Sequence, residues 1–556
     1  MLFAIVLIGV FYYVAKTTKR SADMLLVNGA IYTLDERNTV VQAVAISDGR
    51  IVAVGSTGEL MRMYPAVKAF DLKGKTVIPG LIDGHAHILG EGGRIINLDI
   101  VGTTSPEQIV DMVAKRVSNA VQGSWIIGRG WDQNDWENKV FPTKVLLDNV
   151  APNNPVMLRR VDGHAVWVNS KVLELAGITS STQDPSGGKV IRDAHGNPTG
   201  VLVDNGMDLV DKVVPLLSDA DVEQRLLAAM NECASLGLTE VHDMGVNLQT
   251  INVMKKIIDE GKCPIRIYAL VDGAGETWDY YMKRGPEIGY GNNMLTVRGI
   301  KMYIDGALGS RGAALIDDYS DDPGNRGLLV SSETKLDSVC QQAATNGFQV
   351  CTHAIGDRGN NIVLNVYEKN LKPLKDGGAS LRWRVEHCQV LTPSDISRFA
   401  ELGVIPSMQP THATSDMYWA EDRIGAERVK SAYAWRSIID AHSTIVGGSD
   451  FPVESVNPIL GFYAGATRSD VKGYPADGWH SEQKMTRVEA AKCFTAWAAY
   501  GSFEDKSKGT IEVGKWADLT VLTQDIMTVP QQDILATTVN MTIVGGKIVF
   551  QQQPSN

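Results

Sequence analysis

Two histidines that are two residues apart stand at the end of a long apolar run. The run begins at Val77, is broken by Asp83-Gly84, and leads to His85 and His87. Such a run is typical of a buried strand. Because positions i and i+2 of an extended backbone point to the same face, both imidazoles converge at the end of that strand, where they suit a borderline metal such as zinc. A bare His-x-His also fits two unrelated loop residues, so the rest of the chain must decide.

Further polar residues stand at the ends of later apolar strands. Lys301 lies inside the strand that ends near Ile304. His353 and His387 end the next two strands, and Asp450 follows the last one. Because the carboxyl ends of the strands of a parallel barrel meet at one mouth, we expect these side chains to come together there with the first histidine pair. Buried charges must be paired or bound to metal, so the set predicts a metal centre.

The buried lysine has a predicted role of its own. Among metal ligands Lys301 is favoured as the neutral amine, because desolvation and metal charge both disfavour the ammonium form. A neutral amine can take up carbon dioxide as a carbamate, which would bridge two metal ions about 3.5–4 Å apart that share a hydroxide. In this interpretation His85 and His87 hold the more buried ion. His353 and His387 hold the other.

Asp450 is predicted to be the proton shuttle. It would contact a metal and the hydroxide, take the proton as water attacks, and pass it to the leaving nitrogen. Structural alternatives remain open: Lys301 could pair with Asp305, the later histidines could be ordinary core residues, and Asp450 could cap a helix. His242, at the end of the second strand, is expected to support or pack rather than to bind metal.

Alternating strands and amphipathic helices in the middle of the chain predict a parallel α/β barrel. Its eight strands are expected to end near His87, Asp243, Val271, Ile304, His353, His387, Gln409 and Asp450. Roughly 150 residues separate the first two strands, far more than a normal βα loop. We therefore expect an inserted subdomain over about 92–218, beside the end of the barrel that holds active sites.

Short strands and turn signals mark both ends of the chain. Asn28-Gly29 and Asp48-Gly49 lie between apolar runs, which is a strong hairpin signal, and 542–549 reads as another hairpin. Such small sheets cannot bury a core alone. We expect residues 23–76 and 508–556 to pair into one β-sandwich domain, with the barrel, residues 77–507, between them.

The first 22 residues form a separate segment. Residues 2–15 are apolar, and Lys16, Lys19 and Arg20 follow. As a helix this run spans about 21 Å, against a hydrocarbon core of about 30 Å. We expect a short membrane anchor with the protein body on the cytoplasmic side. A signal peptide for the secretory pathway and a buried helix of a cytoplasmic protein are the alternatives.

Composition limits the class of partner. The chain has 556 residues, a net charge of −11 and no basic block, which argues against a nucleic-acid partner. Its six cysteines form no CxxC pair and are expected to be buried free thiols. The oligomeric state stays open, with a homodimer as one option.

Several motifs together resemble the amidohydrolase superfamily, in particular its amidohydrolase-3 branch with N-substituted formamide deformylase-like proteins. They are VIPGLIDGHAH (77–87), SWIIGRGWDQNDW (124–136), DGHAVWVNS (162–170), IKMYIDGALGSR (300–311), THAIGDRGN (352–360), RVEHCQ (384–389), GGSDFPV (447–453) and GTIEVGKWADLTVL (509–522). The resemblance implies a (β/α)8 TIM barrel with a small β-sandwich, and hydrolysis of C–N bonds other than peptide bonds. It also implies metal ligands at His85, His87, His353, His387 and Asp450, and a bridging Lys301 where two metals are used.

The expected substrate is a small N-substituted amide or formamide, cleaved by a dinuclear zinc hydrolase. Alternatives are a mononuclear deaminase or cyclic-amide hydrolase, and a signalling protein without turnover on the same scaffold. Candidate substrate contacts, each of which could instead be structural, are Trp131, Asp162, His164, Asp305, Arg311 and Gln409. Of these, His164 would polarise the scissile carbonyl and Arg311 would orient a carbonyl or carboxylate.

Overall fold

A computed structural model describes residues 22–160, 165–185, 188–204 and 206–553 of the chain. The chain divides into two units, one of residues 1–88 with 230–556 and one of residues 89–229. Among the described residues no helix has the length and apolar character needed to cross a membrane. The predicted anchor at 2–15 and the candidate substrate residues Asp162 and His164 lie outside the described residues, so these stay predictions.

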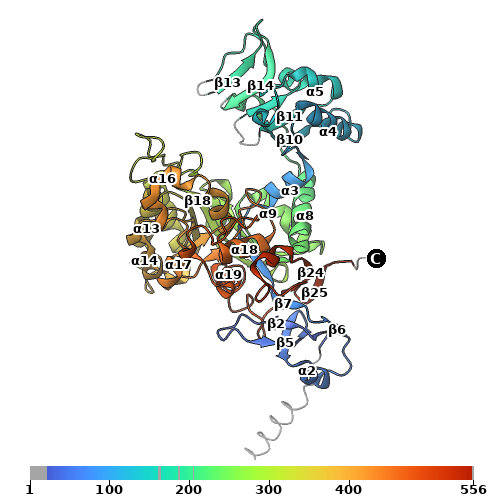
Figure 1. Cartoon of the computed structure of the whole chain (residues 1–556), viewed down its shortest axis with the longest axis vertical. Coiled ribbons are helices and arrows are strands. Elements are labelled where there is room, and N and C mark those ends of the chain that lie inside the picture. Colours follow the sequence, from blue (N-terminus) through green and yellow to red (C-terminus); the bar gives the residue numbers. More distant parts are fainter. Residues whose placement is uncertain (1–21, 161–164, 186–187, 205, 554–556) are drawn as a thin grey trace, which may run out of the picture. The chain divides into compact units, whose positions relative to one another are not determined.

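The first unit contains a parallel eight-stranded barrel, which confirms the predicted fold class (Figure 1). In order around the barrel the strands are β8 (Leu81–Ala86), β15 (Leu238–Val246), β16 (Arg266–Asp272), β18 (Leu295–Tyr303), β19 (Gln349–Ala354), β20 (Arg384–His387), β21 (Ile405–Met408) and β22 (Val446–Gly447). The short β17 (Glu287–Gly289) pairs antiparallel with β18. Each strand ends within three residues of its predicted position, with β15 running on to Val246 and β22 ending at Gly447.

The barrel closes where its last strand meets its first. The backbone N–H of Asp450 donates to the carbonyl of His85 at 2.7 Å, and that of His87 donates to Phe451 at 2.9 Å. A Cβ on Gly84 would lie 2.2 Å from a Val446 methyl carbon, so only glycine permits this approach. The closure brings the two ends of the predicted ligand set, which are 365 positions apart, side by side.

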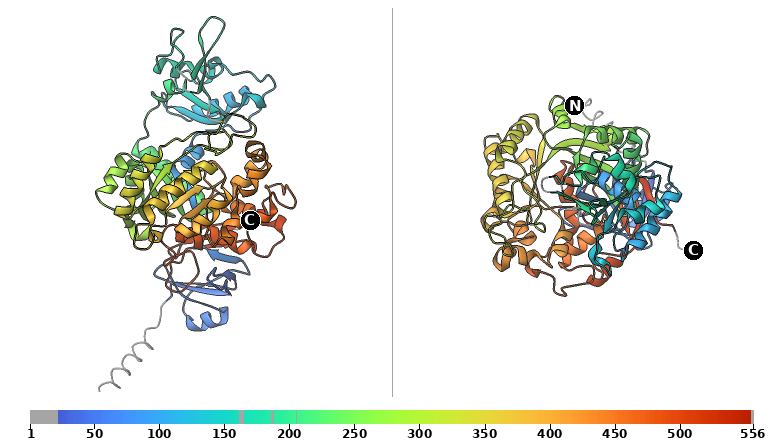
Figure 2. Two further views of the ribbon diagram at one scale, coloured as in Figure 1. Left: turned by 90° about the vertical axis from the view of Figure 1, so that its left-hand side faces the viewer. Right: turned by 90° about the horizontal axis from the view of Figure 1, so that it is seen from above.

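Helices surround the strands, as the right-hand view of Figure 2 shows. They are α8 (Asp219–Ser235), α9 (Leu248–Asp259), α10 (Glu276–Met282), α11 (Tyr290–Asn293), α12 (Glu333–Asn346), α13 (Asp357–Leu371), α14 (Pro393–Leu402), α15 (Pro410–Asp416), α16 (Ala420–Arg428), α17 (Trp435–Asp440), α18 (Pro458–Thr467), α19 (Arg487–Cys493) and α20 (Ala496–Gly501). Local sequence sets their ends. α14 begins at Pro393 after a Thr392 cap and ends at Leu402, where Gly403, whose φ is 64°, forms the C-terminal cap.

Both ends of the chain build the β-sandwich. One sheet has the order β5-β4-β1-β6 and the other β25-β24-β23-β7-β2-β3. The strands are β1 (Met24–Val27), β2 (Ala30–Tyr32), β3 (Val40–Val41), β4 (Ala43–Ser47), β5 (Arg50–Gly55), β6 (Ala69–Asp71), β7 (Thr76–Pro79), β23 (Leu519–Leu522), β24 (Val539–Val544) and β25 (Lys547–Gln551), with α2 (Thr57–Met63) between β5 and β6. Leu26, Val77 and Leu519 share one buried core, so neither chain end forms this layer alone.

One predicted hairpin is wrong. β1 and β2 flank Asn28-Gly29 but lie in different sheets, where β1 pairs with β4 and β6, and β2 pairs with β3 and β7. The turn reverses the chain locally, with Asn28 at φ 57°. Partner choice follows packing instead, because Leu26 and Ile31 enter the same core from opposite sheets. The Asp48-Gly49 and 542–549 hairpins are confirmed.

The apolar run before His85 and His87 forms two consecutive strands that belong to two different sheets. β7 belongs to the sandwich, and β8 begins the barrel after Gly80. A Cβ on Gly80 would lie 2.3 Å from the hydroxyl oxygen of Thr239. Glycine therefore lets the chain pass from one sheet to the other against β15.

The inserted unit is a six-stranded sheet with helices. Its strands, in the order β13-β14-β12-β11-β10-β9, are β9 (Leu98–Asp99), β10 (Ile126–Trp131), β11 (Val156–Arg160), β12 (Ala165–Val168), β13 (Gly188–Arg192) and β14 (Pro198–Asp204). Its helices are α3 (Ile88–Ile96), which starts at the unit boundary, α4 (Pro106–Ser118), α5 (Lys144–Val150), α6 (Ser170–Leu175) and α7 (Asp208–Asp211). Trp131 is 0% exposed in this core, and its Nε1 donates to Leu158 at 2.7 Å. We therefore correct its predicted substrate contact to a packing role.

Candidate metal centre

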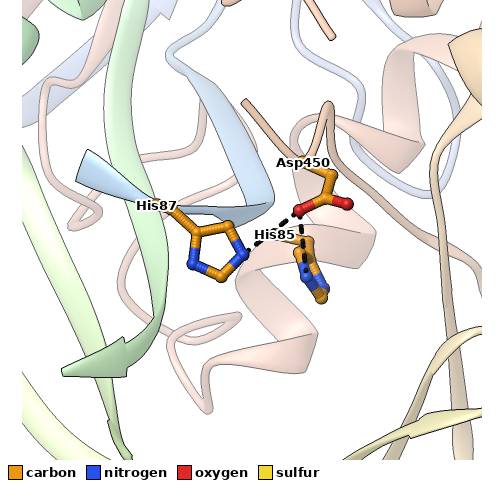
Figure 3. A group of neighbouring side chains, drawn as sticks. All are labelled: His85, His87 and Asp450. Atoms are coloured by element: carbon orange, nitrogen blue, oxygen red, sulfur yellow. Dashed lines mark ion pairs between the residues drawn. The ribbon is translucent and has the colours of Figure 1, made fainter. Parts of the chain in front are cut away.

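Two histidines and an aspartate face one another at the barrel mouth. Figure 3 shows His85 and His87 each turning a nitrogen toward the same carboxylate oxygen of Asp450. Nε2 of His85 lies 3.5 Å from Oδ1 of Asp450, and Nε2 of His87 lies 3.2 Å from it. Their ligand atoms all lie within 4.8 Å of one another. The arrangement follows from the strand pleat of β8 and from barrel closure.

Hydrogen-bond partners on the other side of each ring determine where its proton lies. Nδ1 of His87 is 2.9 Å from the carbonyl oxygen of Met244, and Nδ1 of His85 is 2.6 Å from Oε2 of Glu386. Both partners are acceptors, so each Nδ1 carries the proton and each Nε2 presents a lone pair. Two lone pairs thus face the carboxylate of Asp450. Two imidazole nitrogens and one carboxylate oxygen within reach of one point are ligands that a divalent cation such as zinc prefers, so the residues fit a bound metal ion.

A second group shares the same aspartate. His387, His412 and Asp450 also have ligand atoms within 4.8 Å of one another. Nδ1 of His387 donates to Oε1 of Gln409 at 2.8 Å, which again leaves Nε2 as a lone pair. The His353 ring lies 4.5 Å from the His387 ring, centre to centre. The geometry therefore adds His412, which the sequence pattern did not single out, beside the predicted pair His353 and His387.

Lys301 lies against the first ligand. It is 1% exposed, and its Nζ is 3.1 Å from Nε2 of His85. Burial lowers the pKa of this lysine below its ordinary value, although Glu386 and Asp450 partly oppose the shift. The structural alternative for this lysine, an ion pair with Asp305, is not found among the ion pairs of the described residues. Its contact is with the nitrogen that would bind metal.

The charge states at the mouth favour a cation. Burial, followed by the charge of Lys301, lowers the pKa of His85 to about 4 and that of His353 to about 3. Burial alone would raise the pKa of Asp450, but His85, His87 and His412 outweigh it and hold that pKa well below the ordinary value. His85 and His353 are therefore neutral near pH 7 and Asp450 is ionised, which is the protonation state that binds metal.

A buried ion pair supports the ring of His85 from behind. Arg384 and Glu386 alternate with Val385 along β20, both are 0% exposed, and Nε of Arg384 is 2.8 Å from Oε1 of Glu386. Burial alone would raise the pKa of Glu386, but Arg384 and His85 hold it well below the ordinary value. Nη1 of Arg384 also donates to Nδ1 of His242 at 3.0 Å. This confines His242 to a supporting role, as predicted.

Sequence reasoning missed Glu386, although two charged residues at i and i+2 in an apolar strand were a usable signal. It also missed Asp83, which accepts from the N–H of His85 at 3.1 Å and from the hydroxyl of Ser449 at 2.6 Å. Burial, opposed by these hydrogen bonds, raises the pKa of Asp83 to about 7. Asp83 therefore ties the first strand to the loop that carries Asp450.

Glu386→Gln is expected to weaken metal binding about 10–100-fold, because the amide can turn its N–H₂ toward Nδ1 of His85 and disfavour the ligand tautomer. The measurement is the zinc dissociation constant of the purified full chain by competition with a chelator. Glu427→Gln, on a side chain that is 86% exposed, is the matched control and should bind zinc as the wild type does. Equal zinc affinity in Glu386→Gln and the control would contradict this role.

Three other predicted substrate contacts have partners within the fold. Asp305 is 2% exposed and accepts backbone N–H groups of Ala314, Ile355 and Gly356 at 2.8–3.0 Å, so its role is corrected to loop positioning. Gln409 orients His387, as described above. Arg311 pairs with Asp321 at 2.9 Å and its side chain remains 34% exposed, so a substrate contact by Arg311 stays a prediction.

The barrel and its mouth define the class of metal-dependent hydrolases, in which histidines and a carboxylate at the ends of parallel strands form the metal centre. Comparison with known proteins identifies the group within this class. The sequence profile of the amidohydrolase family matches residues 68–550, and the chain belongs to this family. It is therefore an enzyme that hydrolyses carbon–nitrogen bonds other than peptide bonds.

Similar proteins span almost the whole chain. YtcJ of Bacillus subtilis (strain 168), which is named as an amidohydrolase, is 34% identical over 94% of this chain and 98% of its own. The N-substituted formamide deformylase of Arthrobacter pascens is 27% identical over 96% of this chain and 99% of its own. The crystal structure of a metal-dependent hydrolase from Pyrococcus horikoshii OT3 is 27% identical with a TM-score of 0.77, and covers 91% of this chain and 99% of its own.

Proposed function

We propose that the protein is a zinc hydrolase that cleaves the C–N bond of a small linear amide, in particular an N-substituted formamide. The observation that carries the proposal is the pair of imidazole lone pairs that face one carboxylate oxygen of Asp450 at 3.2 and 3.5 Å. The relative in Arthrobacter pascens, named as an N-substituted formamide deformylase, supports the substrate class.

The ligand set would be shared between two positions. His85, His87 and Asp450 would hold one zinc ion, and His387 with His353 would hold a second. When bound, such an ion lowers the pKa of a coordinated water toward neutrality and polarises a carbonyl oxygen. Glu386 and the Met244 carbonyl accept hydrogen bonds from Nδ1 of His85 and of His87. These contacts leave the Nε2 lone pair of each ring free to bind metal.

Asp450 would move the proton. Its carboxylate is ionised before the reaction, because the neighbouring histidines hold its pKa low. It accepts a proton on a carboxylate oxygen while the water oxygen bonds to the carbonyl carbon. It then donates that proton to the nitrogen as the C–N bond breaks, which yields a carboxylic acid and an amine.

Activity against a defined panel tests the substrate class. The full chain, loaded with zinc, would be assayed against N-substituted formamides, other linear amides and N-acyl amino acids, with detection of free amine and acid. Release of an amine supports the proposal. Release of ammonia by protein with one zinc ion would select a deaminase or cyclic-amide hydrolase instead, and failure to bind metal would favour a protein without turnover.

Lys301→Ala is expected to lower bound zinc from about two ions to about one per chain, because a carbamate on Lys301 would bridge the two sites. Native mass spectrometry of the wild type should show the added mass of carbon dioxide, which the variant lacks. The control is Lys430→Ala, on a side chain that is 61% exposed, and it should keep zinc and mass. A Lys301→Ala protein with full zinc content and full activity would exclude a bridging lysine.

A further inference from the structure

One histidine at the mouth has no role in the ligand set proposed above. His412 lies in α15, directly after β21, and is 8% exposed. Its ring is close to parallel with that of His387, at 17° and 6.0 Å between centres. Its Nε2 lies 3.9 Å from Oδ2 of Asp450 and has no hydrogen-bond partner among the residues that the structure describes. A buried polar atom without a partner is costly, so this nitrogen is available to a bound group.

The hydrogen-bond partner of Nδ1 determines whether Nε2 of His412 is a donor or an acceptor. Nε2 of Gln389 lies 3.2 Å from Nδ1 of His412, and Gln389 is 5% exposed. An amide nitrogen only donates, so Nδ1 of His412 must accept. A neutral imidazole whose Nδ1 accepts carries its proton on Nε2. His412 therefore presents an N–H beside Asp450.

The proton of His412 is therefore on the opposite ring nitrogen from the proton of the neighbouring histidines. His85, His87 and His387 each donate from Nδ1 to an oxygen, and each presents a lone pair on Nε2. A nitrogen that carries a proton cannot bind a metal ion. Although the position of His412 allows it to join a ligand group with His387, its protonation makes it a hydrogen-bond donor at the edge of the metal centre.

We propose that His412 donates a hydrogen bond from Nε2 to the carbonyl oxygen of the substrate amide, and that it is not a metal ligand. The inference rests on the proposed function, in which that oxygen gains negative charge while Asp450 takes a proton. A donor held in place before the reaction stabilises such charge without reorganisation. Gln389 is the positioning residue, because it keeps the Nε2 proton in place.

The first test separates donor from ligand by zinc content. His412→Phe keeps an aromatic ring against His387 but has no N–H, and it should bind as much zinc as the wild type. His387→Phe is the matched comparison and should lose zinc. Formate, the acid released from a formamide, serves as the probe for the donor. Its affinity for the zinc-loaded full chain, measured by calorimetry, should fall about 10–100-fold in His412→Phe.

Gln389→Glu tests the tautomer without removing His412. A carboxylate at this position accepts from Nδ1, so the proton leaves Nε2 and the ring presents a lone pair like its neighbours. We expect zinc content to stay equal or rise, and formate affinity to fall as it does in His412→Phe. This variant keeps the inference testable if the phenylalanine variant does not fold.

Three results would overturn the inference: loss of zinc in His412→Phe to the level of His387→Phe, unchanged formate affinity in both variants, or no formate binding by the wild type. Failure of every amide in the panel would remove the proposed substrate class instead. The zinc and formate measurements need no turnover, so the two failures are distinguishable.

Discussion

Asp450→Asn is expected to lower kcat about 10²–10⁴-fold at saturating zinc. The amide can offer its oxygen to a metal ion, but it cannot accept a proton from water or deliver one to the leaving nitrogen. In the wild type the carboxylate is ionised, because the three neighbouring histidines hold its pKa far below the ordinary value. The assay is steady-state kinetics on the best amide of the panel, with bound zinc quantified in the same samples.

The matched control is Asp440→Asn, on a side chain that is 66% exposed and pairs with Arg436. It should keep the kcat of the wild type. If Asp450→Asn retains more than about a tenth of the wild-type kcat with full zinc, Asp450 is not the proton shuttle, and another group must carry the proton.

Arg384→Met is expected to lower the free energy of unfolding by about 3–5 kcal/mol, because it leaves the carboxylate of Glu386 buried without its main partner. Both side chains are 0% exposed. The guanidinium also donates to the carbonyl of Gly84 at 2.6 Å and to the hydroxyl of Ser407 at 2.8 Å, so three strands lose a shared donor. Urea denaturation followed by tryptophan fluorescence measures the change.

Two companion variants make the Arg384 result specific. Arg384→Met combined with Glu386→Gln removes the unpaired charge and should recover part of the loss. Lys430→Ala breaks an exposed pair with Glu427 and should change stability by about 0–1 kcal/mol. A single Arg384→Met variant as stable as the exposed control would show that the buried charge is satisfied in some other way.

Much of the fold could be predicted because local patterns carry it. The eight barrel strands end within three residues of the predicted positions, since apolar runs followed by polar strand ends repeat along the chain. The predicted Asn28-Gly29 hairpin is wrong because strand pairing there depends on residues that are distant in the sequence. A turn motif determines where the chain reverses, but the partner of each strand depends on the core that Leu26 and Ile31 share with residues from the far end of the chain.

Some residues of the candidate site could likewise be predicted from local sequence, whereas others could not. His85 and His87 could be predicted from the strand pleat taken together with the polar residues at the ends of the later strands. The sequence motif could not show whether Trp131 contacts substrate or packs in a core. The structure shows that its indole packs in the hydrophobic core of the inserted unit. Glu386 had a sequence signal, whereas nothing in the local pattern of residues 409–416 distinguished His412.

By itself, the sequence determined the barrel, the residue types that meet at its mouth and the amidohydrolase family, because pleat, periodicity and motifs are properties of neighbouring residues. Only the tertiary structure decided which nitrogen of each imidazole carries the proton. That choice depends on partners from other strands and loops: Glu386 for His85, the Met244 carbonyl for His87, and Gln389 for His412. Because a ring with a lone pair binds metal and a ring with an N–H binds substrate, the chemistry of the mouth follows from those distant contacts.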